Sequence, residues 1–332
     1  MREIVLAARP RGAPQDDDFE LRDADERSPD EGELLVRNVF VSVDPYMRGR
    51  MTGVRTYVPP YEVGDVVAGG AVGRVVRSRD ERFADGDWVL TMLGWREGGV
   101  VRADRVRKLD PEAAPPATAL GVLGMPGLTA WVGLVDIGRV EAGETIYVSG
   151  AAGAVGSAAA QIAKLKGLRV IGSAGSAEKV EWLRSLGIEA FDYRETDPKE
   201  ALADGLDVYF DNVGGTQLEA ALTALRPFGR VIACGAISRY NDERPEPGPR
   251  NLFLMVTKRL RLQGFIVSDH DDRYPAFVAE VAPWVRDGSI RYRETVVDGI
   301  ENVPGAFAGL FRGDNVGKML VRVGPDQPDQ LG

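Results

Sequence analysis

Residues 145–166, TIYVSGAAGAVGSAAAQIAKLK, decide the fold of this chain. The stretch opens with β-branched and aromatic residues, which predict a buried strand, and it closes with apolar residues at helical spacing. Between these two segments Gly150, Gly153 and Gly156 fall three residues apart. The stretch therefore predicts a strand, a glycine turn and a helix in that order.

This order of elements suits a dinucleotide pyrophosphate. Glycine removes the Cβ atoms that would hold phosphates away from the backbone, and the first N–H groups of the helix then face the negative charge. The spacing G-x-x-G-x-x-G also occurs in plain structural β-α turns, but the flanking strand and helix are the context that the dinucleotide motif requires. We therefore expect a dinucleotide site here.

Composition excludes several classes of partner. The chain has 332 residues, 44% of them apolar, a net charge of -9 and no long block of Lys or Arg, which argues against a nucleic-acid partner. No stretch approaches the ~20 apolar residues of a membrane span, and the N-terminal apolar run is too short for a signal peptide. We expect a cytoplasmic protein with no membrane partner.

Cysteine and histidine, the residues that bind zinc most often, are scarce in this sequence. The sequence holds one cysteine, Cys234, and one histidine, His270. Structural zinc takes four Cys or His ligands, and the catalytic zinc of dehydrogenases also draws on them. We therefore expect no metal site. Cys234 is interpreted as a small buried residue rather than a nucleophile, because its neighbours supply no base.

The segments on either side of a proline-rich junction differ in character. The β-branched stretches 33–43 and 63–77 predict a β-rich, barrel-like first domain. The Pro, Ala and Gly-rich passage 111–126 reads as a domain junction. Beyond it, strands and helices alternate, which predicts an α/β domain with a doubly wound parallel sheet. After residue 288, the short strands and single helix of 292–323 resemble the first domain again.

The elements expected in the α/β domain are strands at 168–171, 207–210, 230–234 and 260–267, and helices at 177–186, 216–225, 252–258 and 274–286. The polar, proline-rich segment 238–249 predicts a long surface loop, a feature that is often functional.

The end of the second strand indicates which nucleotide binds. NAD sites place an acidic residue there to hold the ribose 2′-hydroxyl, but here no acid occurs before Glu178, and Lys179 follows it. A carboxylate would repel a 2′-phosphate, whereas a lysine attracts one. The sequence therefore favours NADPH over NADH. Alternatively, Lys179 is an ordinary exposed lysine at a helix start.

Several motifs together resemble a known family. The chain is similar to the zinc-free medium-chain dehydrogenases/reductases, in the group of leukotriene B4 12-hydroxydehydrogenases, or prostaglandin reductases, and alkenal double-bond reductases. The motifs are VSVDPYMRGRM at 41–51, AAGAVGS at 151–157, YFDNVGG at 209–215, FGRVIACGAIS at 228–238, QGFIVSD at 263–269 and GDNVGK at 313–318. The resemblance implies a GroES-like β-barrel catalytic domain at 1–122, a Rossmann NADPH-binding domain at 123–287, a return to the catalytic domain at 288–332, and a homodimer.

The resemblance also implies the residues that contact NADPH. The pyrophosphate would lie along Ala152, Gly153, Ala154 and Val155, and the 2′-phosphate between Lys179 and Tyr193. The adenosine and ribose side would be lined by Asn212, Cys234, Gly235, Ala236, Ile237 and Tyr240. The nicotinamide carboxamide would meet the backbone of Phe265, Ile266 and Val267, and Asn315 would close over the cofactor. Alternatively, Tyr193 is a surface tyrosine, and 265–267 is simply a core strand.

The activity implied by the resemblance is hydride transfer to the C=C bond of α,β-unsaturated ketones and aldehydes. Charge then builds on the carbonyl oxygen, which hydrogen-bond donors stabilise. Tyr46 is the first candidate for this catalytic role and Tyr240 the second, while Tyr46 could instead be a structural tyrosine beneath the barrel loop. Two alternatives share the cofactor motifs: an NADPH quinone reductase and a non-catalytic NADPH-binding protein.

Overall fold

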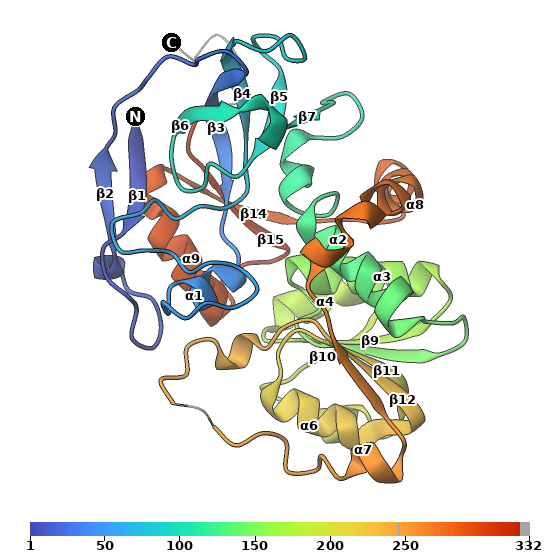
Figure 1. Cartoon of the computed structure of the whole chain (residues 1–332). Helices are drawn as coiled ribbons and strands as arrows, with labels where there is room; N and C mark the ends of the chain where they lie inside the picture. The colour runs from blue at the N-terminus through green and yellow to red at the C-terminus, as the bar shows by residue number, and fades with distance from the viewer. Residues whose placement is uncertain (245, 326–332) are drawn as a thin grey trace. The chain divides into compact units, whose positions relative to one another are not determined.

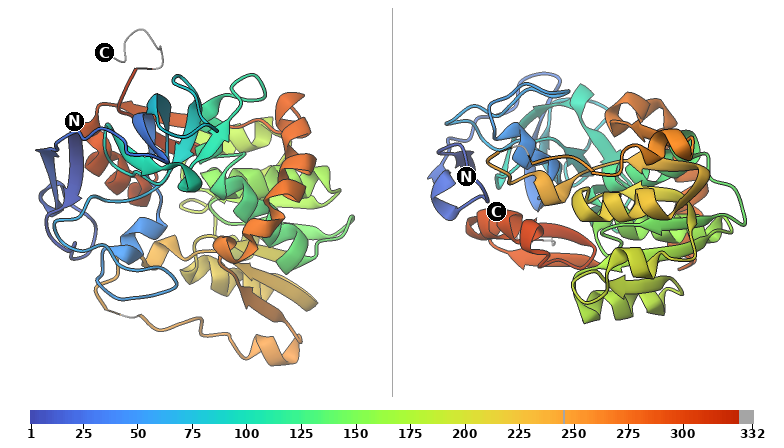
Figure 2. Two further views of the ribbon diagram at one scale, coloured as in Figure 1. Left: turned by 45° about the horizontal axis from the view of Figure 1, so that its top comes forward. Right: turned by 90° about the horizontal axis from the view of Figure 1, so that it is seen from below.

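The computed structural model describes residues 1–244 and 246–325, which divide into two compact units. Unit 1 combines residues 1–120 with the C-terminal segment from Glu294, and unit 2 comprises Gly121–Arg293. The mixed α/β architecture with a parallel sheet in one unit confirms the predicted fold class (Figures 1 and 2).

Unit 1 is built on a seven-stranded sheet, in which β14, β15, β3, β4, β5 and β7 follow one another and β6 pairs with β3. Only the β14–β15 pair is parallel. The elements of unit 1 are β1 (Arg2–Leu6), β2 (Phe19–Asp23), β3 (Glu33–Ser42), α1 (Tyr46–Arg50), β4 (Ala71–Ser78), β5 (Trp88–Thr91), β6 (Gly98–Arg102), β7 (Arg107–Leu109), β14 (Glu294–Asp298), α9 (Val303–Arg312) and β15 (Lys318–Arg322).

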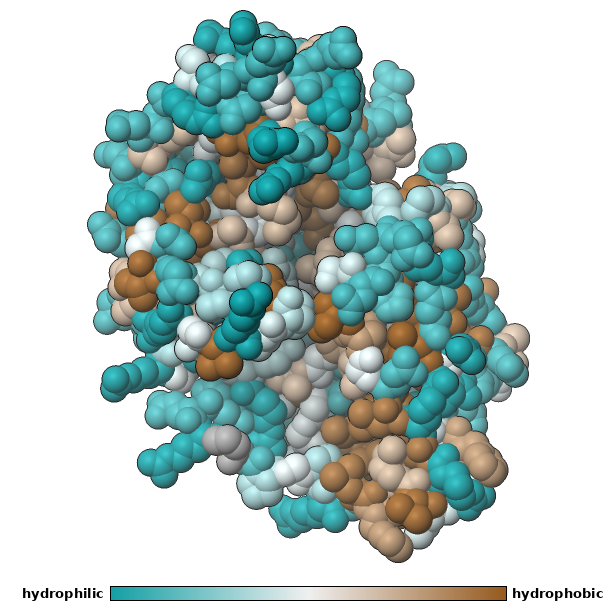
Figure 3. All heavy atoms as spheres, viewed as in Figure 1, coloured by the Kyte–Doolittle hydropathy of each residue, from teal (hydrophilic) through white to brown (hydrophobic). Residues whose placement is uncertain are grey.

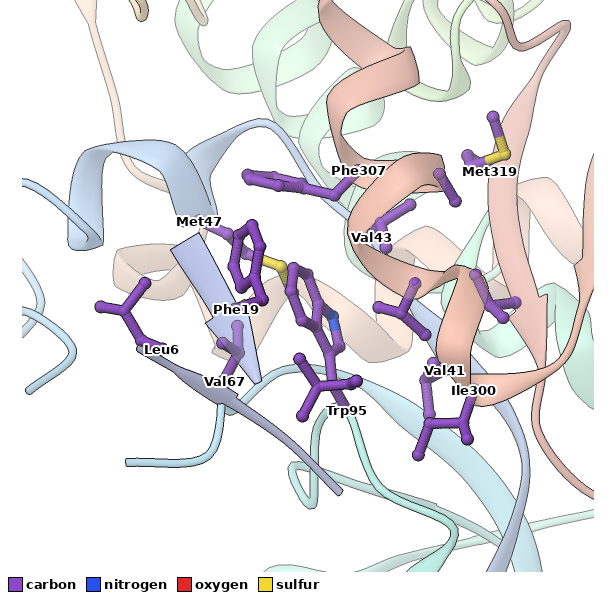
Figure 4. Packing of buried hydrophobic residues seen from close by; sticks show 14 of the residues in the cluster. Leu6, Phe19, Val41, Val43, Met47, Val67, Trp95, Ile300, Phe307 and Met319 are labelled. Atoms are coloured by element: carbon purple, nitrogen blue, oxygen red, sulfur yellow. The ribbon is translucent and has the colours of Figure 1, made fainter. Parts of the chain in front are cut away.

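An aromatic core joins the separate parts of unit 1. The ring of Trp95 lies 5.4 Å from that of Phe19 and 5.4 Å from that of Phe307 on α9. Met47 of α1 and Met319 of β15 belong to the same buried cluster (Figure 4). Burying these side chains ties α1 and the C-terminal segment to the N-terminal strands, because apolar burial is the main favourable term in folding.

Unit 2 is built on a six-stranded, fully parallel sheet with the strand order β10-β9-β8-β11-β12-β13. Helices α3 and α6 lie on opposite faces of it (Figure 1). Its elements are α2 (Met125–Val132), β8 (Thr145–Val148), α3 (Ala154–Leu165), β9 (Arg169–Ala174), α4 (Ala177–Ser185), β10 (Glu189–Asp192), α5 (Pro198–Ala201), β11 (Leu206–Asp211), α6 (Gly215–Ala224), β12 (Leu225–Ala233), α7 (Leu254–Thr257), β13 (Arg261–Gly264) and α8 (Tyr274–Arg286).

This strand order is that of the doubly wound Rossmann fold. The chain proceeds from β8 outward to β10 on one side and then from β11 to β13 on the other. The order therefore reverses between β8 and β11. Ligands of such sheets bind outside the carboxyl ends of the strands at this switch point. The fold directs the search for a site to the loops that follow β8, β9, β11 and β12.

The strand expected at 260–267 is shorter in the structure. It ends at Gly264, because its partner β12 ends at Ala233 and the next two amides, of Cys234 and Gly235, turn to the Asp211 carbonyl instead. The predicted junction 111–126 contains the boundary between the two units, which lies between Leu120 and Gly121. Its last two residues begin α2, a helix in which every residue after Met125 is buried.

Candidate functional site

The turn between β8 and α3 is made by one close backbone contact. A Cβ atom on Gly156 would lie 2.2 Å from the carbonyl oxygen of Gly150, so only glycine lets α3 approach the turn this closely. Gly150 itself has a φ of 59°, a left-handed conformation that favours glycine. The contact sets the start of α3 against the carboxyl end of β8.

The pyrophosphate residues predicted from the sequence lie at this helix start. Ala152 and Gly153 form the end of the turn, and Ala154 and Val155 are the first two residues of α3. No side chain caps the helix. The first N–H groups of a helix have no acceptor within it, and the helix dipole adds partial positive charge at the same place. The turn thus presents backbone donors to an anion.

The loop after β9 brings together the two residues predicted for the 2′-phosphate. Ser176 caps α4, its hydroxyl oxygen accepting the N–H of the half-buried Lys179 at 3.4 Å. The Tyr193 amide donates to Ala174 at 3.1 Å, and a Cβ atom on Gly175 would lie 2.9 Å from the Tyr193 hydroxyl. Both predicted residues therefore border the Gly175–Ser176 turn, and Tyr193 is at the same time an exposed surface residue.

Sequence reasoning missed Arg194 at this place. Its guanidinium lies 5.9 Å from the centre of the Tyr193 ring, and the hydroxyl of that tyrosine borders the Gly175–Ser176 turn. The signal available in the sequence was the basic residue directly after the tyrosine.

A buried carboxylate, Asp211, organises the loop after β11. One of its oxygens accepts hydrogen bonds from the Tyr209 hydroxyl at 2.7 Å, the Gly214 amide at 2.7 Å and the Val213 amide at 3.0 Å. Burial raises the pKa of Asp211, while these donors act in the opposite direction by stabilising the charged form. Asp211 lies within the motif YFDNVGG at 209–215 but was not predicted as a site residue.

Asn212, predicted on the adenosine side, links this loop to the glycine turn. Its side-chain amide donates to the Ser149 carbonyl at 2.8 Å, and its backbone N–H donates to the Ser149 hydroxyl at 3.0 Å. Ser149 directly precedes Gly150, so the end of β11 and the end of β8 are held to each other.

The loop after β12 is hydrogen-bonded to Asp211 and Asn212. The Asp211 carbonyl accepts the amides of Cys234 at 3.0 Å and Gly235 at 2.9 Å. Ile237 donates its amide to the Asn212 carbonyl at 3.2 Å. The predicted residues Cys234, Gly235, Ala236 and Ile237 therefore lie at the sheet edge beside Asn212.

The chemistry of Cys234 and Tyr240 follows from these contacts. Burial, with a further effect from the Asp211 carboxylate, raises the pKa of Cys234 to about 12, so its sulfur stays a thiol near neutral pH. The thiol form makes Cys234 a poor nucleophile, and the residue is half-buried rather than fully buried as predicted. The Tyr240 hydroxyl oxygen accepts the Ala236 amide at 3.2 Å, so this tyrosine folds back over the loop before it.

The segment 265–267 continues from β13 at the same edge of the sheet. Phe265 and Ile266 lie beyond the strand, and Val267 begins the 3-10 helix η6 (Val267–Arg273). The interpretation of 265–267 as part of a core strand is therefore wrong. Arg273 at the end of η6 donates two hydrogen bonds to Asp136, at 2.8 and 2.9 Å, which fixes the segment's far end.

The remaining predicted residues belong to unit 1. Tyr46 is the first residue of α1, and burial raises its pKa well above the usual range, with a further increase from the Asp44 carboxylate. Its hydroxyl therefore stays protonated and can donate a hydrogen bond. Asn315 lies between α9 and β15, where its side-chain amide donates to the Gly317 carbonyl at 2.6 Å.

Within residues 1–244 and 246–325, no three His, Cys, Asp or Glu side chains gather as a metal ion would require. None of the helices in these ranges has the length and apolar character needed to cross a bilayer.

Known proteins resemble the chain along nearly its whole length. Residues 2–109 match the family described as N-terminal domain of oxidoreductase, and residues 154–282 the family described as zinc-binding dehydrogenase. The NADPH-dependent curcumin reductase of Escherichia coli (strain K12) is 45% identical, covering 98% of this chain and 97% of the relative. The NADP(+)-dependent 2-alkenal reductase of Nicotiana tabacum is 39% identical, covering 97% of each.

A solved structure agrees with the sequence relatives. The crystal structure of CurA from Vibrio vulnificus in complex with NADPH matches with a TM-score of 0.92 at 41% identity, covering 99% of this chain and 100% of that one. The chain belongs to the medium-chain dehydrogenase/reductase family. The resemblance to the alkenal and prostaglandin reductase group is confirmed, and this family member is an NADPH-dependent reductase.

The geometry of the reductase fits its cofactor. The close approach of Gly156 to Gly150 leaves the uncapped start of α3 facing the sheet edge, as a pyrophosphate requires. The Lys179 backbone and the Tyr193 hydroxyl border the Gly175–Ser176 turn, and Arg194 lies against the Tyr193 ring, so a lysine and an arginine belong to the adjoining segments. The individual contacts of these residues with NADPH stay predictions.

Replacing Lys179 by alanine tests the 2′-phosphate assignment. We expect the Kd for NADPH to rise about ten-fold, the loss of one charge-assisted hydrogen bond, while the Kd for NADH stays unchanged because NADH lacks the 2′-phosphate. Fluorescence titration with each nucleotide measures both constants. Lys199→Ala, on an exposed residue of the same unit, is the matched control. Equal losses for NADPH and NADH would contradict the assignment.

Proposed function

We propose that this reductase transfers hydride to the C=C bond of α,β-unsaturated ketones and aldehydes. The proposal is carried by the similarity over nearly the whole chain to relatives named 2-alkenal reductase and curcumin reductase, at 39% and 45% identity. Tyr46, a half-buried tyrosine that begins α1, is the candidate donor, since a tyrosine hydroxyl is protonated near neutral pH.

The chemistry requires one hydride, one proton and one place for transient charge. When bound, NADPH supplies the hydride, which adds to the β-carbon of the substrate. The electron pair of the C=C bond shifts toward the carbonyl, so negative charge builds on the carbonyl oxygen until a proton reaches the α-carbon. The Tyr46 hydroxyl donates a hydrogen bond to that oxygen, and such a donor lowers the barrier by a few kcal/mol. Water or a tyrosine then supplies the proton.

Polar side chains lie around Tyr46, which is half-buried. The Arg50 guanidinium, one turn later on α1, lies 3.9 Å from the centre of the Tyr61 ring, and the Tyr61 hydroxyl donates to the Ala68 carbonyl at 2.5 Å. Arg50 lowers the pKa of Tyr46, opposing the effects of burial and Asp44. Tyr240, whose oxygen accepts the Ala236 amide, is the second candidate, with a role in ordering its own loop.

Replacing Tyr46 by phenylalanine tests the assignment. We expect kcat on an enone to fall about 100-fold, as for the loss of one donor to a developing oxyanion, with the Kd for NADPH unchanged. Tyr57→Phe, on an exposed tyrosine of the same unit, is the matched control. Wild-type turnover of Tyr46→Phe would move the donor elsewhere, with Tyr240→Phe as the next variant.

The substrate panel for this experiment separates the proposal from its alternatives. NADPH carrying deuterium at the transferred position is oxidised with 2-alkenals, enones and simple quinones, and NMR locates the label. Deuterium on the β-carbon of a saturated product supports the proposal. Turnover of quinones alone would indicate a quinone reductase, and NADPH binding without oxidation by any of these compounds would indicate a binding protein.

We also propose that the protein is a homodimer joined at β13. This strand is the last of the unit 2 sheet and pairs only with β12 within the described residues, and three of its four residues are exposed. Exposed apolar side chains surround it, and Figure 3 shows apolar residues gathered where Figure 1 places α7. They are Phe228, Leu252, Phe253, Val256 and Leu262.

A second copy of the chain suits this edge because a twofold axis pairs the same strand with itself, which closes the assembly and leaves no open edge. We expect Phe253→Asp combined with Val256→Asp to give a monomer by light scattering after size exclusion. Leu21→Asp, on an exposed apolar residue of unit 1, is the control that stays dimeric. An unchanged mass for the double variant would contradict this interface.

A further inference from the structure

A buried ion pair joins two sequence motifs of unit 1. The Lys318 ammonium donates to the Asp44 carboxylate at 2.9 Å and to the Val43 carbonyl at 2.8 Å, and the Ser42 hydroxyl donates to the other carboxylate oxygen. The side chains of Lys318 and Asp44 are only 4% and 9% exposed. The pair connects the start of β15 to the chain segment between β3 and α1.

A gain in the free energy of unfolding does not by itself explain why a protein buries such an ion pair. Taking two charges out of water costs free energy that their attraction recovers only with good geometry, and apolar side chains often serve as well. Buried ionic groups have a clearer use where they fix one arrangement of the chain.

The pair holds the beginning of α1. This helix has five residues, far fewer than a helix needs to persist alone, and no side chain caps it. The Asp44 carbonyl accepts the Met47 amide at 3.1 Å, so Asp44 forms the first turn. At the other side, the Arg48 guanidinium donates to the carbonyls of Pro10 and Gly12. Lys318 and Arg48 thus hold α1 from two directions.

The charges around Lys318 include a second carboxyl group. Glu294 of β14 lies opposite Lys318 in the strand register, and burial raises its pKa while Lys318 acts to lower it. The Asp44 carboxylate in turn raises the pKa of Tyr46. Lys318 is therefore the compensating cation for a carboxylate two residues from the proposed donor.

We propose that Lys318 is a positioning residue, which holds Asp44 and, through Asp44, the first turn of α1, so that the Tyr46 hydroxyl keeps one orientation. This rests on the proposed function, in which Tyr46 assists reduction of the substrate. Lys318 lies 272 residues after Tyr46 in the sequence (318 − 46 = 272), and only folding brings them into one unit.

A double-mutant cycle between Lys318→Met and Tyr46→Phe tests the inference. We expect Lys318→Met to lower kcat on an enone on the order of ten-fold in the wild-type background and less than about two-fold in the Tyr46→Phe background, since coupled residues lose their effects non-additively. KM and the Kd for NADPH should change little, because the Lys318 ammonium is buried against Asp44 and the Val43 carbonyl. Lys108→Met, which breaks the surface pair with Asp87, is the matched control and keeps wild-type turnover.

A structural measurement that does not depend on enzyme turnover accompanies the double-mutant cycle. Hydrogen exchange followed by mass spectrometry should show faster exchange at 44–51 in Lys318→Met, with α9 of the same unit unchanged. If Lys318→Met fails to fold, the double variant Lys318→Met, Asp44→Asn takes its place in both backgrounds. The double variant removes both charges, so no lone buried charge is left at Asp44.

The outcomes separate the inference from the function on which it rests. Equal loss of kcat in both backgrounds, or unchanged exchange at 44–51, would overturn the role of Lys318 while leaving Tyr46 as donor. Wild-type turnover of Tyr46→Phe would remove Tyr46 from the reaction, and the role of Lys318 with it. A ten-fold loss that disappears in the Tyr46→Phe background supports the inference.

Discussion

The contact between Gly156 and the carbonyl oxygen of Gly150 is the constraint on which unit 2 depends. It lets α3 begin directly at the end of β8, at the point where the strand order of the sheet reverses. A methyl group at residue 156 would push the helix away and separate its first N–H groups from the turn. The predicted anion site is thus built from backbone spacing, with no charged side chain in the turn itself.

Buried carboxylates order the segments around both predicted sites. In unit 2, Asp211 and its neighbour Asn212 connect the loops after β8, β11 and β12 through hydrogen bonds to backbone groups. In unit 1, Asp44 joins β15 to the first turn of α1 through Lys318. Each unit uses one acidic residue to hold several loops, because a carboxylate accepts several hydrogen bonds at once.

The sequence predicted the elements whose patterns are local. The strand and helix around the glycines, the parallel sheet and the helix ending before Pro227 follow from periodicity and turn residues, and the structure contains them. It could not predict α2, whose buried sides lack a period, or the end of β13, which depends on where the amides of Cys234 and Gly235 find an acceptor. The Asp44–Lys318 pair is likewise invisible before folding, since its partners are far apart in the chain.

The affinity of Gly156→Ala for NADPH tests the role of this backbone contact, measured by isothermal titration calorimetry with circular dichroism to verify the sheet. We predict that the Kd rises at least about ten-fold while the sheet signal stays, because α3 is displaced from the pyrophosphate. Gly305→Ala, where a Cβ atom meets nothing within 4 Å, should bind as the wild type does. A wild-type Kd for a folded Gly156→Ala protein would show that the site does not depend on the Gly156–Gly150 contact.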